Sequence, residues 1–181
     1  DGTIATGQSF VMNLRKEKFK DIKVREALSL MFNFEWSNAT LFYGLYARIN
    51  SFWENSDLAA IGVPEGEELD LLVELVDEGS LSTEILTNLA ISAPTSGSRQ
   101  LDRKNLRAAS KLLDDAGWVV GDDGKRRKDG KTLDVEFLEA SPAFDRIVNP
   151  FVENLISLGV NAKLNRIDYA QYTNRTRSFD F

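Results

Sequence analysis

The sequence contains no cysteine and no histidine among its 181 residues. The missing thiols exclude disulfides, cysteine nucleophiles and zinc–thiolate sites. The missing imidazoles exclude Ser-His-Asp triads and histidine-ligated metals. No apolar run reaches the roughly 18–20 residues that a membrane span needs. Neither a membrane span nor the commonest forms of nucleophilic and metal catalysis are therefore expected.

What is present is an acidic chain of ordinary globular composition, 43% hydrophobic and 28% charged, with a net charge of −6. The charge is uneven, because residues 51–100 contain one arginine and ten acidic residues. Nucleic acid demands clustered lysine and arginine, so it is not an expected partner. The one dense basic run, residues 125–128, lies between two Asp-Gly turns, and we expect it on a solvated hairpin edge.

Motifs that carry chemistry are scarce. Neither of the common glycine-rich phosphate loops occurs. Carboxylates are abundant, but those of the helical pattern over residues 65–84 fall mostly on a predicted solvated face, where burial does not raise a pKa. Two alternatives stay open on these residues alone. One is a hydrolase that uses two carboxylates, and the other is an acidic module that binds a basic partner.

The hydrophobic spacing predicts an α/β fold. Asp21 caps one predicted helix, and Asp102 caps the clearest one, which ends at Gly117. A strand near residues 133–137, a helix opened by Pro142 and a strand over 160–164 predict a parallel pair joined by a right-handed crossover. Further expected elements are strands at 9–14 and 179–181, helices at 34–45 and 65–84, a meander over 118–138, and a last helix from Asp168.

Residues 44–64 follow no clear period and mix aromatic rings with hydrogen-bonding groups. Such a loop suits a ligand surface. The alternative is that Tyr46, Phe52 and Trp53 fill the core beneath the loop.

Several stretches together resemble bacterial extracellular solute-binding proteins of family 5, the capture subunits of ATP-driven importers. The resemblance lies in FVMN at 10–13 with FKDIKVREAL at 19–28, DRKNLRAASKLLDDAGW at 102–118, GKTL at 130–133, LGV at 158–160, and DYAQY at 168–172 with the end of the chain. Residues 41–56 also resemble the oligopeptide-type branch associated with import of microcin C and murein-derived peptides.

The resemblance implies one lobe of a type II periplasmic-binding-protein-like fold, with a mixed sheet flanked by helices. Residues 1–181 would be the C-terminal lobe, with residues 1–14 near one crossover and residues 175–181 starting the return crossover. The partners implied are a peptide or peptide-like solute, the membrane permease of an ABC importer, and a missing N-terminal lobe. A periplasmic location, a signal peptide in the precursor, no enzymatic activity, no metal and no cofactor are also implied.

The ligand-binding candidates follow from the same resemblance. They are Tyr46, Arg48, Ser51, Phe52, Asn55 and Arg175. For both arginines an internal ion pair is the alternative. Asn13 is the hinge candidate, with backbone capping as its alternative. Within the family, nickel chelates, sugars and opines remain possible solutes. The segment that anchors a peptide's amino terminus in oligopeptide binders would follow residue 181, so that contact is not assigned here.

Overall fold

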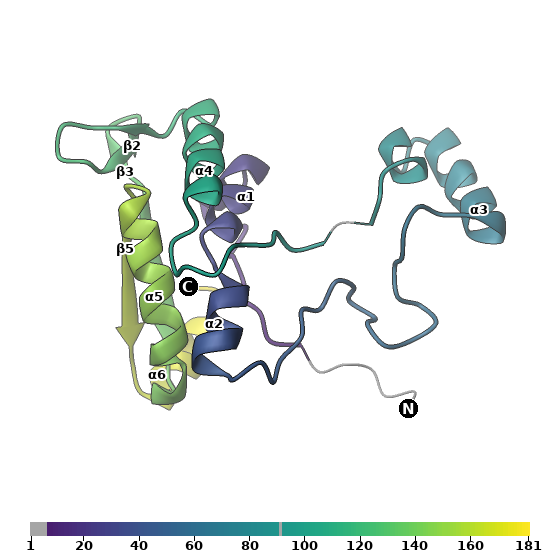
Figure 1. The fold of residues 1–181 in the computed structure, drawn as a ribbon. Coiled ribbons are helices and arrows are strands. Elements are labelled where there is room, and N and C mark those ends of the chain that lie inside the picture. The colour runs from purple at the N-terminus through teal and green to yellow at the C-terminus, as the bar shows by residue number, and fades with distance from the viewer. Residues whose placement is uncertain (1–6, 91) are drawn as a thin grey trace. The chain divides into compact units, whose positions relative to one another are not determined.

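The computed structural model describes residues 7–90 and 92–181. The chain divides into two compact units (Figure 1). The smaller unit is formed by Asp1–Ser9 and Ala47–Ala93, and the larger unit by Phe10–Tyr46 and Pro94–Phe181. Of the helices in the described residues, none is long and apolar enough to cross a membrane.

The larger unit contains most of the secondary structure. Its helices are the 3-10 turn η1 (Glu17–Phe19), α1 (Ile22–Leu30), α2 (Phe34–Leu41), α4 (Arg103–Asp115), the 3-10 turn η3 (Pro142–Phe144), α5 (Asp145–Ser157) and α6 (Tyr169–Arg177). Its strands are β1 (Val119–Val120), β2 (Arg126–Lys128), β3 (Lys131–Thr132), β4 (Asp134–Glu139) and β5 (Asn161–Arg166). The smaller unit carries α3 (Gly66–Asp77) and the 3-10 turn η2 (Thr83–Leu86).

The strands form two small sheets. The first is an antiparallel meander in the order β1-β2-β3. In the second, β4 and β5 are parallel and in register from Asp134 opposite Asn161 to Glu139 opposite Arg166. The helix α5 connects them, which confirms the predicted strand–helix–strand crossover.

The helix ends form where the sequence signals them. The carboxylate of Asp21 accepts from the backbone N–H of Lys23, and that of Asp102 accepts from the N–H groups of Lys104 and Asn105. After α4, Gly117 has φ +83°, and the next N–H, of Trp118, donates to the carbonyl of Leu113 at 2.8 Å. Left-handed backbone of this kind is available to glycine without a Cβ penalty, so the helix stops there.

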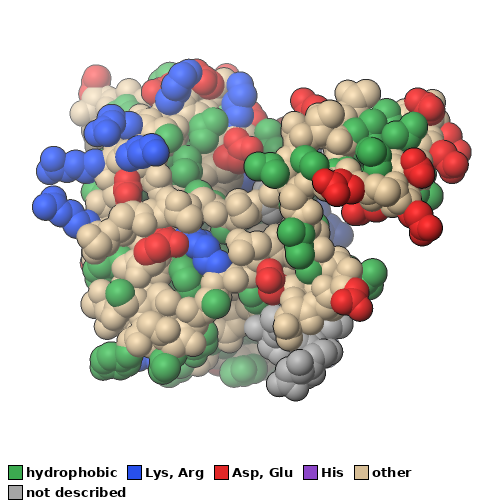
Figure 2. All heavy atoms as spheres, turned by 45° about the vertical axis from the view of Figure 1, so that its right-hand side comes forward, with side chains coloured by type: hydrophobic (Ala, Val, Ile, Leu, Met, Phe, Trp, Pro, Cys, Tyr) green, Lys and Arg blue, Asp and Glu red, His purple; other side chains and the backbone are tan. Residues whose placement is uncertain are grey.

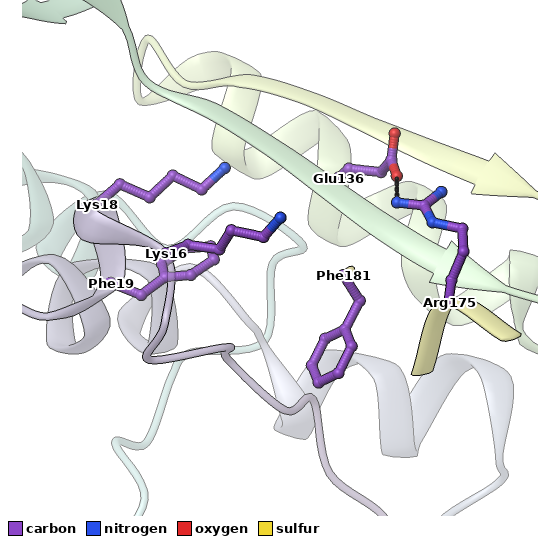
Figure 3. Close-up of a pocket in the computed structure, with 6 residues that line it drawn as sticks. All are labelled: Lys16, Lys18, Phe19, Glu136, Arg175 and Phe181. Atoms are coloured by element: carbon purple, nitrogen blue, oxygen red, sulfur yellow. Dashed lines mark hydrogen bonds and ion pairs between the residues drawn. The ribbon is translucent and has the colours of Figure 1, made fainter. Parts of the chain in front are cut away.

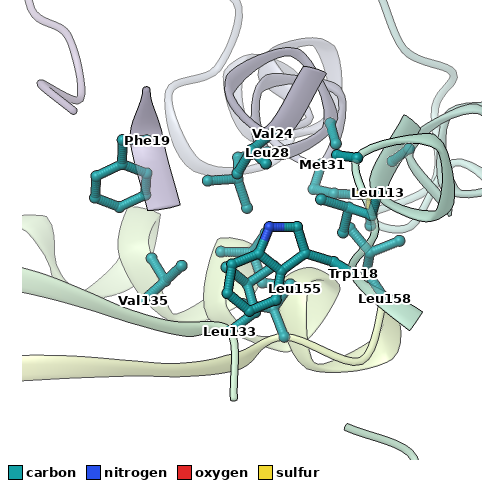
Figure 4. Packing of buried hydrophobic residues seen from close by; sticks show 14 of the residues in the cluster. Phe19, Val24, Leu28, Met31, Leu113, Trp118, Leu133, Val135, Leu155 and Leu158 are labelled. Carbon is teal, nitrogen blue, oxygen red and sulfur yellow. The ribbon is translucent and has the colours of Figure 1, made fainter. Parts of the chain in front are cut away.

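A single apolar core lies within the larger unit (Figure 4). Val24, Leu113, Leu133 and Leu155 have no exposed surface. They come from α1, α4, the turn before β4, and α5, so the core joins both sheets to three helices. Trp118, which follows the end of α4, is also buried.

Three sequence-based expectations are wrong. Neither residues 9–14 nor residues 179–181 form a strand; the ring of Phe10 instead packs edge-on against Phe32 and Phe151, 5.2 Å from each. No strand of the described residues lies beside either segment to complete a backbone ladder. The basic run is not simply a solvated edge, because β2 is the central strand of its sheet and Arg126 is 1% exposed.

Candidate ligand-binding site

A hollow of about 220 Å³ opens in the larger unit, and its walls combine charged groups of both signs with two phenyl rings (Figure 3). The residues that line it are Lys16, Lys18, Phe19, Glu136, Arg175 and Phe181. They come from the segment before α1, from β4, and from α6 with the residues that follow it. Three regions distant in sequence therefore meet at this hollow.

The carboxylate of Glu136 lies between two cations. Arg175 Nη2 is 2.8 Å from one of its oxygens, and Lys163 Nζ is 3.1 Å from the other. Burial acts to raise the pKa of Glu136, but the hydrogen bonds from Lys163, Arg175 and Asn165 outweigh it, so the pKa lies below its usual range. Glu136 is therefore a fixed negative charge at neutral pH and does not serve as a proton donor.

Lys18 places its ammonium close to the same strand. Its Nζ donates to the carbonyl of Asp134 at 2.5 Å and lies 5.0 Å from the centroid of the Phe19 ring. Burial lowers the pKa of Lys18, because a partly enclosed ammonium loses hydration. The hollow thus presents a partly desolvated cation beside an apolar ring.

Asn13 joins the two ends of the larger unit. It is 3% exposed, and its Nδ2 donates to the carbonyl of Phe179 at 2.7 Å and to that of Phe181 at 3.1 Å. Its Oδ1 accepts from the N–H of Arg15 at 3.1 Å, and the Arg15 guanidinium lies 3.6 Å from the centroid of the Phe179 ring. This is the backbone-capping arrangement weighed for Asn13, while its hinge role stays a prediction.

Arg175 belongs to the same junction. Its Nε donates to the carbonyl of Asp180 at 2.8 Å, and Asp180 also forms an ion pair with Lys16 at 3.1 Å. Hydrogen bonding and the charge of Lys16 hold the pKa of Asp180 low, with a further contribution from Arg175. The internal ion pairs weighed for Arg175 are present, and they place its guanidinium on the wall of the hollow.

Three of the other candidates lie together in one loop of the smaller unit. Ser51 Oγ accepts from the N–H groups of Trp53 at 3.3 Å and Ala60 at 3.0 Å, which ties the loop together. Phe52 is 86% exposed, and its ring stands edge-to-face with Trp53 at 5.1 Å. Asn55 has φ +63°, a left-handed turn position that asparagine tolerates. The ring of Phe52 does not fill a core in this unit.

The remaining two candidates differ in their surroundings. Tyr46, in the larger unit, exchanges two hydrogen bonds between its backbone and the side-chain amide of Asn38, and its ring lies 4.7 Å from that of Phe42. Arg48 is half-buried in the smaller unit. The two units are separate bodies, so the structure groups Asn13 with Arg175 and groups Ser51, Phe52 and Asn55 with one another.

Sequence reasoning missed the residues that complete the hollow, namely Lys16, Lys18, Phe19, Glu136 and Phe181. Nothing local in the sequence signals that they meet. No group of three or more acidic residues among those described is placed to hold a metal ion.

Two solved structures share this fold over most of the chain. NikZ from Campylobacter jejuni, in complex with Ni(L-His), aligns with a TM-score of 0.60 at 21% identity, covering 87% of this chain and 25% of its own. The oligopeptide-binding protein AppA from Bacillus subtilis, in complex with a nonapeptide, aligns with a TM-score of 0.57 at 19% identity, covering 90% of this chain and 26% of its own. The class is therefore the type II periplasmic-binding-protein fold, as expected.

Comparison of sequences gives the family. The family model described as bacterial extracellular solute-binding proteins, family 5, middle region, matches residues 2–181, and the chain belongs to this family. The probable peptide-binding protein YejA of Agrobacterium fabrum is 44% identical over 175 residues. That match covers 96% of this chain but 28% of the relative, so the chain spans less than a third of its length. The resemblance drawn from the motifs is confirmed.

Proposed function

We propose that the whole protein is the solute-binding component of an ABC importer and that it captures peptides for a membrane permease. The observation that carries this proposal is the family match over residues 2–181, together with 44% identity to a probable peptide-binding protein. The family is an extracellular one, which supports a periplasmic location for the whole protein. The function proposed is binding and delivery, with no chemical step.

The chain would supply one of two lobes that close on the solute, with residues 1–14 and 175–181 near the connections to the other lobe. Asn13 supports this arrangement, because it joins residues close to both ends of the larger unit. If the two connections between the lobes are held at a fixed spacing, they can act together as one hinge during lobe closure. Arg15, Lys16 and Asp180 add an ion pair and a ring contact to the same junction.

Peptide capture suits the chemistry of the walls. A buried peptide brings backbone N–H and carbonyl groups that must find partners, and a carboxylate that pairs well with arginine. The larger unit offers Arg175 and Lys18 beside Phe19. The exposed ring of Phe52 offers an apolar surface in the smaller unit. Ordered water would fill the remaining space around variable side chains.

The two alternatives gain no support from the described residues. A two-carboxylate hydrolase needs acids converging in one cleft, but the hollow in the larger unit is lined by one carboxylate, Glu136, whose pKa is lowered. The carboxylates of α3 lie on exposed positions. An acidic interaction module would require a basic partner, and the family match favours a small solute instead.

The decisive experiment compares the full-length protein with residues 1–181 by calorimetry against a panel of peptides. We expect micromolar or tighter binding of at least one peptide by the full-length protein. One lobe supplies about half of the contacts while the entropy cost of association is unchanged, so we expect binding by residues 1–181 to be about millimolar or weaker. Micromolar binding by residues 1–181 would refute the two-lobe arrangement, and no binding by the full-length protein would refute peptide capture.

A further inference from the structure

A second hollow, of about 310 Å³, lies entirely within the smaller unit. The residues that line it are Asn50, Glu54, Ala59, Ala60, Ile61, Gly62, Ala90 and Ser92. Glu54 is the one ionisable side chain among them, and the others are small, amide, hydroxyl or aliphatic groups. The hollow has room for a small functional group and not for a whole peptide.

The carboxylate of Glu54 is held in a fixed position. Its Oε2 accepts from the backbone N–H of Asn50 at 2.9 Å and from that of Ser51 at 3.2 Å. Within the described part of the chain, these two N–H groups are its hydrogen-bond partners. Because a carboxylate has about four acceptor positions, this anchoring leaves others open to a ligand. The side chain is thus oriented in advance, which reduces the entropy cost of binding.

The loop around Glu54 is built to keep that position. Ser51 Oγ accepts from the N–H of Ala60 at 3.0 Å, across nine residues, and the N–H of Ala90 donates to the carbonyl of Gly62 at 2.7 Å. Ser56 Oγ donates to the carbonyl of Trp53 at 2.6 Å. Both sides of the hollow are therefore tied by hydrogen bonds within the same unit.

The charge of this unit defines what the hollow attracts. Residues 47–93 contain one basic residue, Arg48, and ten acidic ones. Figure 2 shows red acidic side chains among green apolar ones over the unit that carries α3, and blue basic ones over the larger unit. A field of one sign raises the local concentration of oppositely charged ligands. A cation is attracted and an anion is repelled.

We propose that this hollow is a subsite for a primary ammonium group, with Glu54 as its counter-ion. An ammonium has three donors and no acceptor, so it matches a carboxylate flanked by amide and hydroxyl oxygens. Small walls at Ala59, Ala60 and Gly62 leave room for the alkyl stem behind the charge. This subsite rests on the proposed function, since a captured peptide can bring the ammonium either at its amino terminus or on a lysine-like side chain.

The test uses the full-length protein labelled with ¹³C at alanine methyl groups, which places three probes in the wall, at Ala59, Ala60 and Ala90. Butylammonium chloride is titrated first, with butanol as the uncharged probe. We expect saturable shifts of these methyl signals with butylammonium and none with butanol. Glu54→Gln should weaken the affinity for butylammonium, measured from these methyl shifts, at least tenfold. Glu74→Gln, which removes the same charge from an exposed position on α3, should leave it unchanged. Absence of saturable shifts, or equal effects of both variants, would overturn the subsite.

Peptides then separate the two sources of the ammonium. A tripeptide with a free amino terminus, its N-acetylated form, and an N-acetylated tripeptide containing lysine are titrated against the same labelled protein. Loss of the methyl shifts on acetylation assigns the subsite to the amino terminus, and their return with lysine assigns it to a side-chain amine. If peptides bind by calorimetry but neither source moves these signals, the subsite is wrong and the proposed function stands. If butylammonium binds and no peptide does, the ammonium subsite stands and the proposed function is wrong.

Discussion

Replacement of Arg126 by leucine should strongly destabilise the larger unit. The guanidinium is almost fully buried and is satisfied by four groups. Its Nε donates to the carbonyl of Leu158 at 2.8 Å, Nη1 donates to the carbonyl of Trp118 at 2.6 Å and to Asp114 at 2.7 Å, and Nη2 donates to Ser110 Oγ at 2.6 Å. Arg126 thus joins α4, β2 and the turn after α5.

The magnitude follows from what the change leaves behind. Leucine removes all four donors, and the carbonyls of Leu158 and Trp118 have no replacement partner among the described residues. Each buried acceptor left unpaired costs about 1–3 kcal/mol. The Asp114 carboxylate is half-exposed and recovers hydration from water, so it adds little. The two unpaired carbonyls together predict a loss of about 2–6 kcal/mol in the free energy of unfolding.

Urea unfolding followed by circular dichroism measures this loss. Arg127→Leu is the matched control on the next residue, because its ion pair with Asp123 lies at the surface and such pairs contribute about 0–1 kcal/mol. Arg126→Lys should fall between the two, since lysine keeps the charge but cannot donate in four fixed directions. A loss below about 1 kcal/mol for Arg126→Leu, equal to that of the control, would refute the reasoning from unpaired carbonyls.

Three further changes probe the ends, the cap and the aromatic loop. Asn13→Ala should lower the free energy of unfolding by about 1–3 kcal/mol, because the carbonyls of Phe179 and Phe181 lose their donor; an unchanged urea midpoint would contradict this. Asp102→Ala should cost about 1 kcal/mol at pH 7. Backbone hydrogen bonds from Asn105 and Gly97 hold the pKa of Asp102 below its usual range. The stabilisation by Asp102 is therefore full above about pH 4 and is lost as the pH falls through the folded-state pKa. The urea midpoints of the wild type and Asp102→Ala should converge as the pH falls, and a difference that does not change with pH would contradict this. Phe52→Ala should weaken peptide binding by the full-length protein about tenfold without moving its urea midpoint, since the ring is exposed; unchanged affinity by calorimetry would remove Phe52 from the ligand surface.

Local signals in the sequence were enough for much of the fold. The caps at Asp21 and Asp102 depend on residues two or three positions away, and both form as predicted. The last helix also begins directly after Asp168, as predicted. The crossover from β4 to β5 follows from apolar periodicity and the handedness of such units. The motifs gave the family because they are distributed along the whole chain.

Contacts between distant residues could not be read in the same way. Asn13 meets residues 166 and 168 positions later, and nothing in the neighbourhood of any of them shows this. Arg126 looks like part of a solvated basic run until β2 is placed between β1 and β3 with α4 beside it. The burial of a side chain depends on which elements the fold packs against it. The local sequence KRRK therefore does not show that one of its arginines is buried.

Arg175 shows why an internal ion pair and a binding role are compatible. A guanidinium has five N–H donors in a rigid plane. Nε is used by the carbonyl of Asp180 and Nη2 by Glu136, and the described contacts leave Nη1 available. Glu136 is itself shared with Lys163, so it does not cancel the positive charge of Arg175. The two acids orient the guanidinium in the wall of the hollow, and a peptide carboxylate that binds there need not displace them.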